Sequence, residues 1–392
     1  MKIFSENVES IIKELELIKD SFGTTSIRKI SDNIEMLESF YELLLETSGL
    51  RDTDALDILT KYDKYRDIKT SGRNLLRKKT IENFIQNKDF HKSTSGKVIK
   101  LYDKKFNYYG KKNLNLKEDE MCEILCNFLA DEFNQADEFK QMINEKRIFR
   151  LYVDEKEFSE LQAYGGYTMF DYITRNNFIV VSNDKSVKDM EMMRIIAHEF
   201  GHAIDNKESK FASRKDIVRY YWISSYGEVF SMLYEKLFVD YLLKNNIYKD
   251  SANWILFRAF YKPVYDNFNS LEYISSLEDK LITNKKYQKE ENIPEQIEVS
   301  EDGVLYIAKA VIEDFDEVNR YSYGGLLANY FAYLKHNDEK EFKRQFDIFK
   351  NNRFKYFNPK LFEDLGTNID EIISIYNKGL EEMTDNKKLI LK

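Results

Sequence analysis

The sequence predicts a mainly α-helical protein with a small β-sheet. The 392-residue chain contains only three prolines and 14 glycines, so long helices can run without interruption. Apolar residues recur at helical spacing over most of the chain, and only two short stretches have the length and composition of strands. A chain of this length is long enough for two lobes or two domains.

The first 147 residues have the pattern of successive amphipathic helices. Ile11, Leu15 and Ile18, for example, follow one another at helical spacing. The stretch 89–115 is polar and rich in lysine, which predicts a loop or an exposed hairpin. The pattern changes after Arg147, and we place the boundary between two domains there.

Strands and further helices are expected after this boundary. Residues 148–153 and 177–182 are short apolar runs with aromatic or β-branched side chains, which is typical of strands. Residues 296–307 allow either a hairpin or a helix that begins at Val304, and helices then continue to the C-terminus. Between the second strand and this segment, we expect three helices over 187–205, 214–243 and 251–280.

Composition excludes several classes of protein. The net charge is −8 and both signs are mixed along the chain, without the basic patch of a nucleic-acid-binding protein. The N-terminus acquires acidic residues before any apolar run long enough for a signal peptide, and no window approaches ~18 apolar residues. Cys122 and Cys126 are too few for a disulfide scaffold, and we expect two buried thiols on a helix. The composition predicts a cytoplasmic protein that binds neither membranes nor nucleic acids.

A motif of the form HExxH lies in the helix expected over 187–205. It consists of His198, Glu199 and His202 in the segment HEFGHAID. Residues i and i+4 share one helix face, so both imidazoles can reach one ion while the glutamate stands beside it. Zinc favours imidazole and carboxylate ligands, and a catalytic zinc leaves one position open for water. The motif predicts a zinc site with His198 and His202 as ligands and Glu199 as the catalytic base.

A third metal ligand is expected downstream. The spacing HExxHxxGxxH is excluded, because position 208 is a glutamate and the next histidine is His336. Glu228 is the candidate, because it lies in an otherwise apolar segment where a buried carboxylate needs a partner. Ser231 and Glu235 share its predicted helix face, and Glu235 would orient a ligating histidine. The alternative is that Glu228, Glu235 or both face solvent.

These motifs resemble the M3 peptidases, the group of thimet oligopeptidase and oligoendopeptidase F. HEFGHAID followed by E-x-x-S-x-x-x-E carries the resemblance, which extends over about 160–383. Supporting segments are 163–180, with its glycines and tyrosines, Tyr321-Ser322-Tyr323, and 361–381. The resemblance implies a two-lobed helical body around a deep channel, with a small sheet beside the metal helix. It further implies an N-terminal helical lobe over 1–147 and a catalytic domain over 148–392.

The resemblance also implies how a substrate would be bound. The edge strand expected at 177–182 would pair with an extended peptide. Tyr323, with Tyr321 as the second candidate, would donate to the oxyanion from a tyrosine-rich loop that Gly324-Gly325 lets move. The alternative is that both tyrosines are packing residues at the start of a helix. The chain departs from the family in its shorter length and in having Glu313-Asp314-Phe315 where members carry a histidine.

The function expected is that of a zinc-dependent endopeptidase, a hydrolase that cleaves short unstructured oligopeptides. One alternative is a dedicated protease for a single leader peptide or protein, of the toxin or maturation type. Another is a non-catalytic peptide-binding protein with a structural metal, although an intact Glu199 argues against it. No role is expected for His91, which we place at the surface, or for His336 at a helix end. No feature predicts an oligomeric state.

Overall fold

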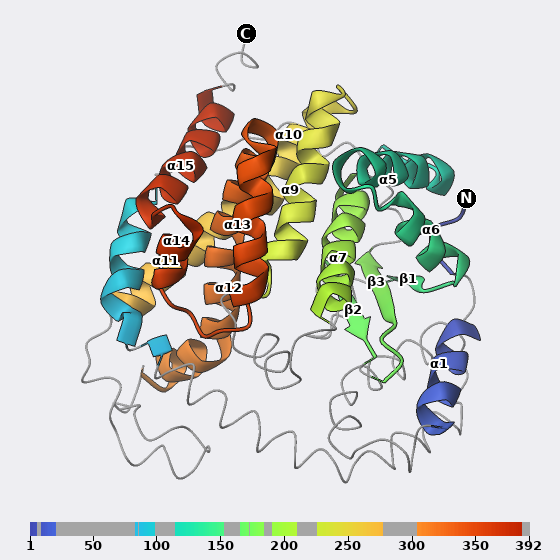
Figure 1. The fold of residues 1–392 in the computed structure, drawn as a ribbon, viewed down its shortest axis with the longest axis horizontal. Helices are drawn as coiled ribbons and strands as arrows, with labels where there is room; N and C mark the ends of the chain where they lie inside the picture. Colours follow the sequence, from blue (N-terminus) through green and yellow to red (C-terminus); the bar gives the residue numbers. More distant parts are fainter. Residues whose placement is uncertain are drawn as a thin grey trace. The chain divides into compact units, whose positions relative to one another are not determined.

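Most residues of the computed structural model that can be described are helical (Figure 1). The strands among them form one three-stranded sheet. The predicted mainly α-helical class with a small sheet is therefore confirmed. No helix within this part of the chain is long and apolar enough to cross a membrane. The described residues are 1–5, 9–20, 83–84, 86–98, 114–152, 165–171, 173–183, 190–209, 226–276 and 304–385.

Two compact units alternate along the sequence. Unit 1 is drawn from Met1–Ser71, Gly110–Phe211 and Leu237–Ala252, and unit 2 from Gly72–Tyr109, Ala212–Lys236 and Asn253–Lys392. The predicted domain boundary after residue 147 stays a prediction. The two-lobed channel implied by the resemblance also stays a prediction.

The helices of unit 1 bury the apolar faces that the sequence predicts. Ile11 and Ile18 of α1 are fully buried, and Leu15 nearly so. Cys122 and Cys126 are buried free thiols on α5 with their sulfurs 3.9 Å apart, as expected. Helix α9 begins in unit 2 and continues into unit 1, where Phe238 packs edge-on against Phe128 of α5. The bounds are α1 (Glu9–Asp20), α5 (Glu118–Phe133), α6 (Ala136–Asn144), α7 (Met190–Glu208) and α9 (Val229–Lys244).

The sheet of unit 1 has the strand order β1-β3-β2. Strand β3 (Asn177–Asn183) pairs in parallel with β1 (Ile148–Tyr152) and antiparallel with β2 (Gly165–Phe170). Both predicted strands are confirmed, but the expectation that 177–182 forms an edge strand is wrong. Four consecutive residues of β3, Phe178 to Val181, are buried, which is typical of a central strand. Helix α7, which carries the HExxH motif, packs against β2 and β3 (Figure 1). Since β3 is central, β2 is the edge strand that lies beside this helix.

Unit 2 is built from helices. The helix predicted over 251–280 is interrupted by a π-helical turn, η3, whose last residue, Tyr261, accepts a hydrogen bond at its carbonyl from the Tyr376 hydroxyl (2.7 Å). Val304 begins a helix, so the helical alternative for this position is confirmed. Helix α10 (Lys249–Ile255) begins in unit 1 and ends in unit 2. The bounds of the others are η3 (Leu256–Tyr261), α11 (Lys262–Ser276), α12 (Val304–Asn337), α13 (Glu339–Asn352), α14 (Lys360–Leu365) and α15 (Ile369–Asp385).

A further helix of unit 2 corrects one prediction. Residues 86–97 are helical and are drawn in cyan in Figure 1. The prediction of a loop or exposed hairpin over 89–115 is therefore wrong for residues 89–97. Polar residues cover the outer side of this helix, whereas His91, Thr94 and Ser95 are buried. The lysine-rich composition concealed a helix whose inner side carries few aliphatic residues. The rest of the predicted loop, 99–113, lies outside the described residues.

Candidate active site

Helix α7 presents the two histidines of the HExxH motif on one face, within unit 1. The rings of His198 and His202 have centroids 5.1 Å apart at an interplanar angle of 77°, and both side chains are half-buried. Phe200, between them in sequence, is buried and packs edge-on against Phe139 of α6. The apolar side therefore fixes the rotation of the helix and with it the direction in which the two histidines project.

Polar bonds tie the C-terminal half of α7 to the start of β3. The Asn177 amide donates to the Ala203 carbonyl (3.1 Å), and the Asn206 amide donates to the side-chain oxygen of Asn177 (2.8 Å). All three residues are buried, where an unsatisfied amide would be costly. These bonds hold the helix against the sheet at a fixed position along its axis.

Glu199 points from α7 toward β2. Its side chain is 3% exposed, and the Thr168 hydroxyl lies 2.8 Å from Oε2 and 2.9 Å from the Glu199 backbone oxygen. Gly166, two residues earlier on β2, faces the same way, and an added Cβ there would lie 2.9 Å from Glu199 Cγ. The carboxylate is thus enclosed between the helix and the edge strand.

Glu228 lies in unit 2, in the turn directly before α9. The side chain is 6% exposed, and the Ser231 hydroxyl donates to its Oε2 (2.8 Å). Tyr226, at the start of the turn, is fully buried and accepts a hydrogen bond from the Asn358 backbone (3.5 Å). Glu235, two turns further along, is also buried, at 2% exposure. The alternative that these two glutamates face solvent is therefore wrong.

Helix α12 makes a close approach to Glu228. A Cβ added at Gly324 would lie 3.0 Å from Glu228 Cβ, and one at Gly325 would overlap Val264 Cγ2 on α11. Because glycine has no side chain, α12 can lie close to Glu228 and to α11 at these two positions. The expectation that Gly324-Gly325 serve as a mobile hinge is wrong, because both lie inside the continuous helix α12.

Tyr321 and Tyr323 also lie inside α12 and not in a loop. Tyr323 is fully buried, its hydroxyl lies 2.8 Å from His91 Nδ1, and burial raises its pKa well above the usual value. Tyr321 is half-buried. The two candidates for the oxyanion donor therefore differ in burial, since Tyr323 is enclosed in the core and Tyr321 is not. Within unit 2, the surroundings of Tyr323 are those of a packing residue, which is the alternative interpretation of this side chain.

His91 was expected at the surface and is fully buried instead. Its ring stacks on Phe84 (centroids 5.4 Å apart) and contacts Phe357 (4.7 Å) as well as Tyr323 (5.5 Å). Burial lowers its pKa from 6.5 to about 3, so the imidazole is neutral at physiological pH. The sequence signal that could have located it is helical spacing, because Phe84, His91 and Ser95 fall on one helix face.

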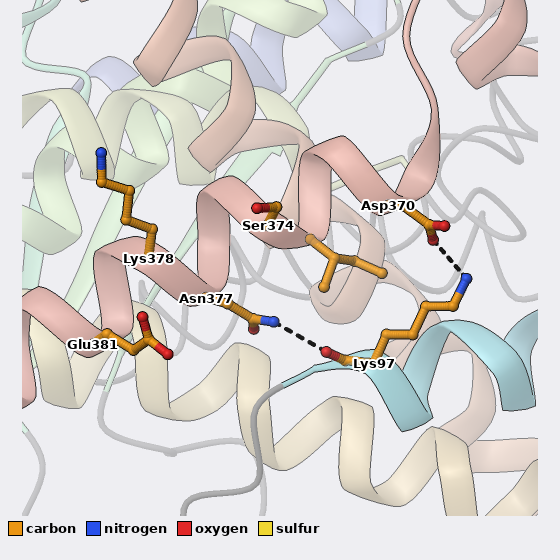
Figure 2. A pocket seen from close by; sticks show the side chains of 7 residues that line it. Lys97, Asp370, Ser374, Asn377, Lys378 and Glu381 are labelled. Atoms are coloured by element: carbon orange, nitrogen blue, oxygen red, sulfur yellow. Dashed lines mark hydrogen bonds and ion pairs between the residues drawn. The ribbon is translucent and has the colours of Figure 1, made fainter.

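A surface pocket of about 570 Å³ lies between the 86–97 helix and α15 (Figure 2). In it Lys97 forms an ion pair with Asp370 (2.6 Å), and the Asn377 amide donates to the Lys97 carbonyl (3.0 Å). The remaining lining residues include Ser374, Lys378 and Glu381. No histidine or cysteine is among the described residues that line this pocket, and Lys97 and Asp370 are paired at the surface, so these residues offer no catalytic set of their own.

Within each unit the structure brings part of the predicted site together. His198, Glu199 and His202 share α7 in unit 1, and Glu228 lies with Ser231 in unit 2. Sequence analysis missed Thr168, the partner of Glu199. The alternation of strand side chains was the available signal, because it places Thr168 and Gly166 on one face of a strand next to the motif helix.

Comparison with known proteins finds similarity in solved structures only. No protein-family model matches the sequence, and no curated protein does. A protein assigned as oligoendopeptidase F from Bacillus anthracis is 16% identical with a TM-score of 0.45, over 91% of this chain and 65% of that one. An inhibitor-bound PZ peptidase A is 15% identical with a TM-score of 0.42, over 90% and 66%. A protein assigned as a peptidase from Chlamydophila abortus is 14% identical with a TM-score of 0.43, over 98% and 65%.

The chain thus has low structural similarity to these three proteins. It spans 65% of the length of the Bacillus anthracis protein and a similar share of the other two. TM-scores below 0.5 assign neither a family nor an activity to the chain.

Proposed function

We propose that this protein is a zinc-dependent endopeptidase that cleaves short, unstructured peptides. The observation that carries the proposal is the arrangement on α7, where two half-buried imidazoles share a face and the intervening Glu199 is buried beside them. A helix that only held a metal would not need a carboxylate at this position.

The donors suit zinc. His198, His202 and Glu228 are two imidazoles and one carboxylate, a set of ligands typical of catalytic zinc, and we assign the metal to them. Ser231 holds one oxygen of Glu228, and Glu235 is the residue we assign to orienting a histidine ligand. When bound, the ion would supply Lewis-acid polarisation of a carbonyl and acidification of water.

The protein's own residues would then move the proton and bind the developing charge. Glu199 takes the proton from the attacking water and hands it to the departing amine. A tyrosine hydroxyl donates to the carbonyl oxygen as that oxygen becomes anionic. We assign this donor to Tyr321 first, because its side chain is half-buried. Tyr323 is the second candidate, because it would have to give up its bond to His91.

Strand β2 supports an extended substrate. It pairs with β3 on one side, and among the described residues no strand pairs with its other side. A peptide that adds to this edge must be extended over several residues, since the ladder is formed by backbone groups. Short flexible chains satisfy this requirement, whereas a folded domain has to unfold locally first.

A fluorogenic peptide library, assayed with and without a strong chelator, tests the proposal. We expect about one zinc per chain, cleavage of many unstructured peptides, and loss of cleavage with chelator that added zinc restores. A folded protein with the same sequence as a cleaved peptide in one surface loop is the matched control, and it should survive. Cleavage restricted to one sequence would favour the dedicated protease, and zinc binding without any cleavage would favour the peptide-binding protein.

A further inference from the structure

The side chains of β2 that face α7 meet Glu199. Gly166 and Thr168 lie two residues apart on the strand, so they share the face that packs against the helix. The Thr168 hydroxyl lies 2.8 Å from Glu199 Oε2. A hydroxyl has a single hydrogen, and a charged carboxylate is a stronger acceptor than the Glu199 backbone oxygen at 2.9 Å.

Gly166 brings the strand backbone over the other half of the carboxylate. An added Cβ at this position would lie 3.0 Å from Glu199 Oε1 and 2.6 Å from Ile195 Cγ2. Both oxygens of Glu199 therefore face the same strand, one beside Gly166 and the other beside Thr168. The carboxylate has little freedom to rotate without moving β2.

Burial makes the threonine hydroxyl important. Glu199 is 3% exposed, and a buried carboxylate without a hydrogen-bond donor is strongly disfavoured. Thr168 supplies such a donor from a fixed place, because β2 is held in the sheet through its pairing with β3. A base whose orientation is fixed in this way loses less entropy on reaching the transition state.

We propose that Thr168 is a positioning residue that fixes the Glu199 carboxylate for proton transfer. The inference rests on the proposed peptidase function. It ties the orientation of the base to β2, the same strand whose free edge we assign to the substrate. The Thr168 side chain faces α7, whereas the peptide would pair with strand backbone. Loss of the hydroxyl should therefore lower kcat and leave KM nearly unchanged.

The experiment compares Thr168→Val, which keeps the shape and removes the hydroxyl, with Thr168→Ser, which keeps the hydroxyl. We expect Thr168→Val to lower kcat about 10–100-fold, with zinc content unchanged, and Thr168→Ser to restore most of the rate. Thr367→Val is the matched control. Thr367 donates to Glu371 (2.7 Å) at the surface of unit 2, so the same change removes the same kind of bond elsewhere. A wild-type kcat for Thr168→Val would overturn the proposal.

A double-mutant cycle separates this inference from the proposed function. In a Glu199→Gln background, Thr168→Val should cost little further rate, because the hydroxyl acts through the carboxylate. An equal fold-loss in both backgrounds would overturn the positioning role. In the metal-free protein, the effects of the two substitutions on the urea midpoint should also be non-additive. A wild-type protein that binds zinc but cleaves no peptide overturns the proposed function. The metal-free cycle then decides alone whether Thr168 holds Glu199.

Discussion

The carboxyl groups of unit 1 and the aromatic core of unit 2 stabilise buried ionisable groups in different ways. Unit 1 buries carboxyl groups and gives each one a hydroxyl donor, Thr168 for Glu199 and Thr174 for Glu14. At the core of unit 2, a neutral imidazole and a phenol, His91 and Tyr323, bond to each other inside a cluster of aromatic rings. The first arrangement fits a group that must exchange a proton, and the second fits a group that must stay neutral.

The comparison indicates which buried ionisable groups we expect to take part in chemistry and which in packing. A hydroxyl partner orients a carboxyl group, whereas an aromatic enclosure removes the imidazole from titration in the physiological range. We therefore expect substitutions at Glu199 to act on rate, and substitutions at His91 or Tyr323 to act on stability.

The largest effect is expected from the two glutamates of the proposed site. Glu199→Gln removes the base and should lower kcat by about 10²–10⁴-fold with zinc retained, because Glu199 is not a ligand. Glu228→Gln should instead weaken zinc binding, since a neutral amide oxygen is a poorer ligand than a carboxylate. Peptide cleavage and zinc content of the purified variants measure the two effects. Equal zinc binding by both variants would show that the roles are wrongly divided.

The next largest effect distinguishes the two tyrosines. Tyr321→Phe should lower kcat about 10²–10³-fold at unchanged stability, which is the usual cost of removing one oxyanion donor. Tyr323→Phe leaves His91 without this partner in a buried site and should lower the free energy of unfolding by about 1–3 kcal/mol. Steady-state kinetics and urea unfolding of both variants check this. The reverse pattern, a rate loss for Tyr323→Phe with a normal urea midpoint, would return the oxyanion role to Tyr323.

The sequence predicts the local part of this site well. Helix α7 and the strands β1 and β3 follow from spacing and composition, and the HExxH motif needs only helical geometry to place its histidines on one face. Burial of Glu228 and Glu235 was also foreseen, because the segment around them is apolar.

The parts that were not predicted depend on contacts between distant segments. A loop was expected at Tyr321–Gly325 because the peptidase family that the motifs resemble carries a tyrosine-rich substrate loop there. Tertiary packing instead makes Gly324 and Gly325 the close-approach points of a helix, against Glu228 and Val264. His91 lies 232 residues from its partner Tyr323, and nothing in the sequence near His91 indicates that pairing. The order of strands, which decides that β2 is the edge, is likewise set by pairing alone.

A smaller effect concerns the response of unit 2 to acid. Burial lowers the pKa of His91 from 6.5 to about 3. Below pH 6.5 the unfolded chain therefore binds a proton at His91 that the folded state does not bind. Stability should therefore fall as the pH drops, by about 2 kcal/mol between pH 6.5 and pH 5. Urea midpoints of wild type and His91→Gln across this range measure the contribution. His336→Gln, at an exposed histidine, is the control for the loss of one imidazole.

The smallest effect has the opposite sign and belongs to unit 1. Glu14 of α1 is buried beside Asp171, with the Asn176 amide 3.0 Å from its Oε2, and burial first and Asp171 second raise its pKa from 4.5 to about 7. The folded state therefore holds a proton that the unfolded chain releases above pH 4.5. This contribution is complete below pH 4.5 and is lost as the pH rises through 7.

We expect the Glu14 effect to be about 1 kcal/mol, because its interaction with Asp171 divides the shift between two carboxyl groups. The measurement compares urea midpoints of wild type, Glu14→Gln and Glu16→Gln between pH 4.5 and pH 7.5. Glu16 is an exposed glutamate on the same helix, so it controls for the loss of one charge. His91 is intact in all three proteins, and its opposite contribution cancels in the differences. The stability of wild type relative to Glu14→Gln should fall as the pH rises, whereas relative to Glu16→Gln it should stay level. A level difference for Glu14→Gln as well would mean that unit 1 does not respond to pH through this carboxyl group, and the contrast in sign between the two units would be lost.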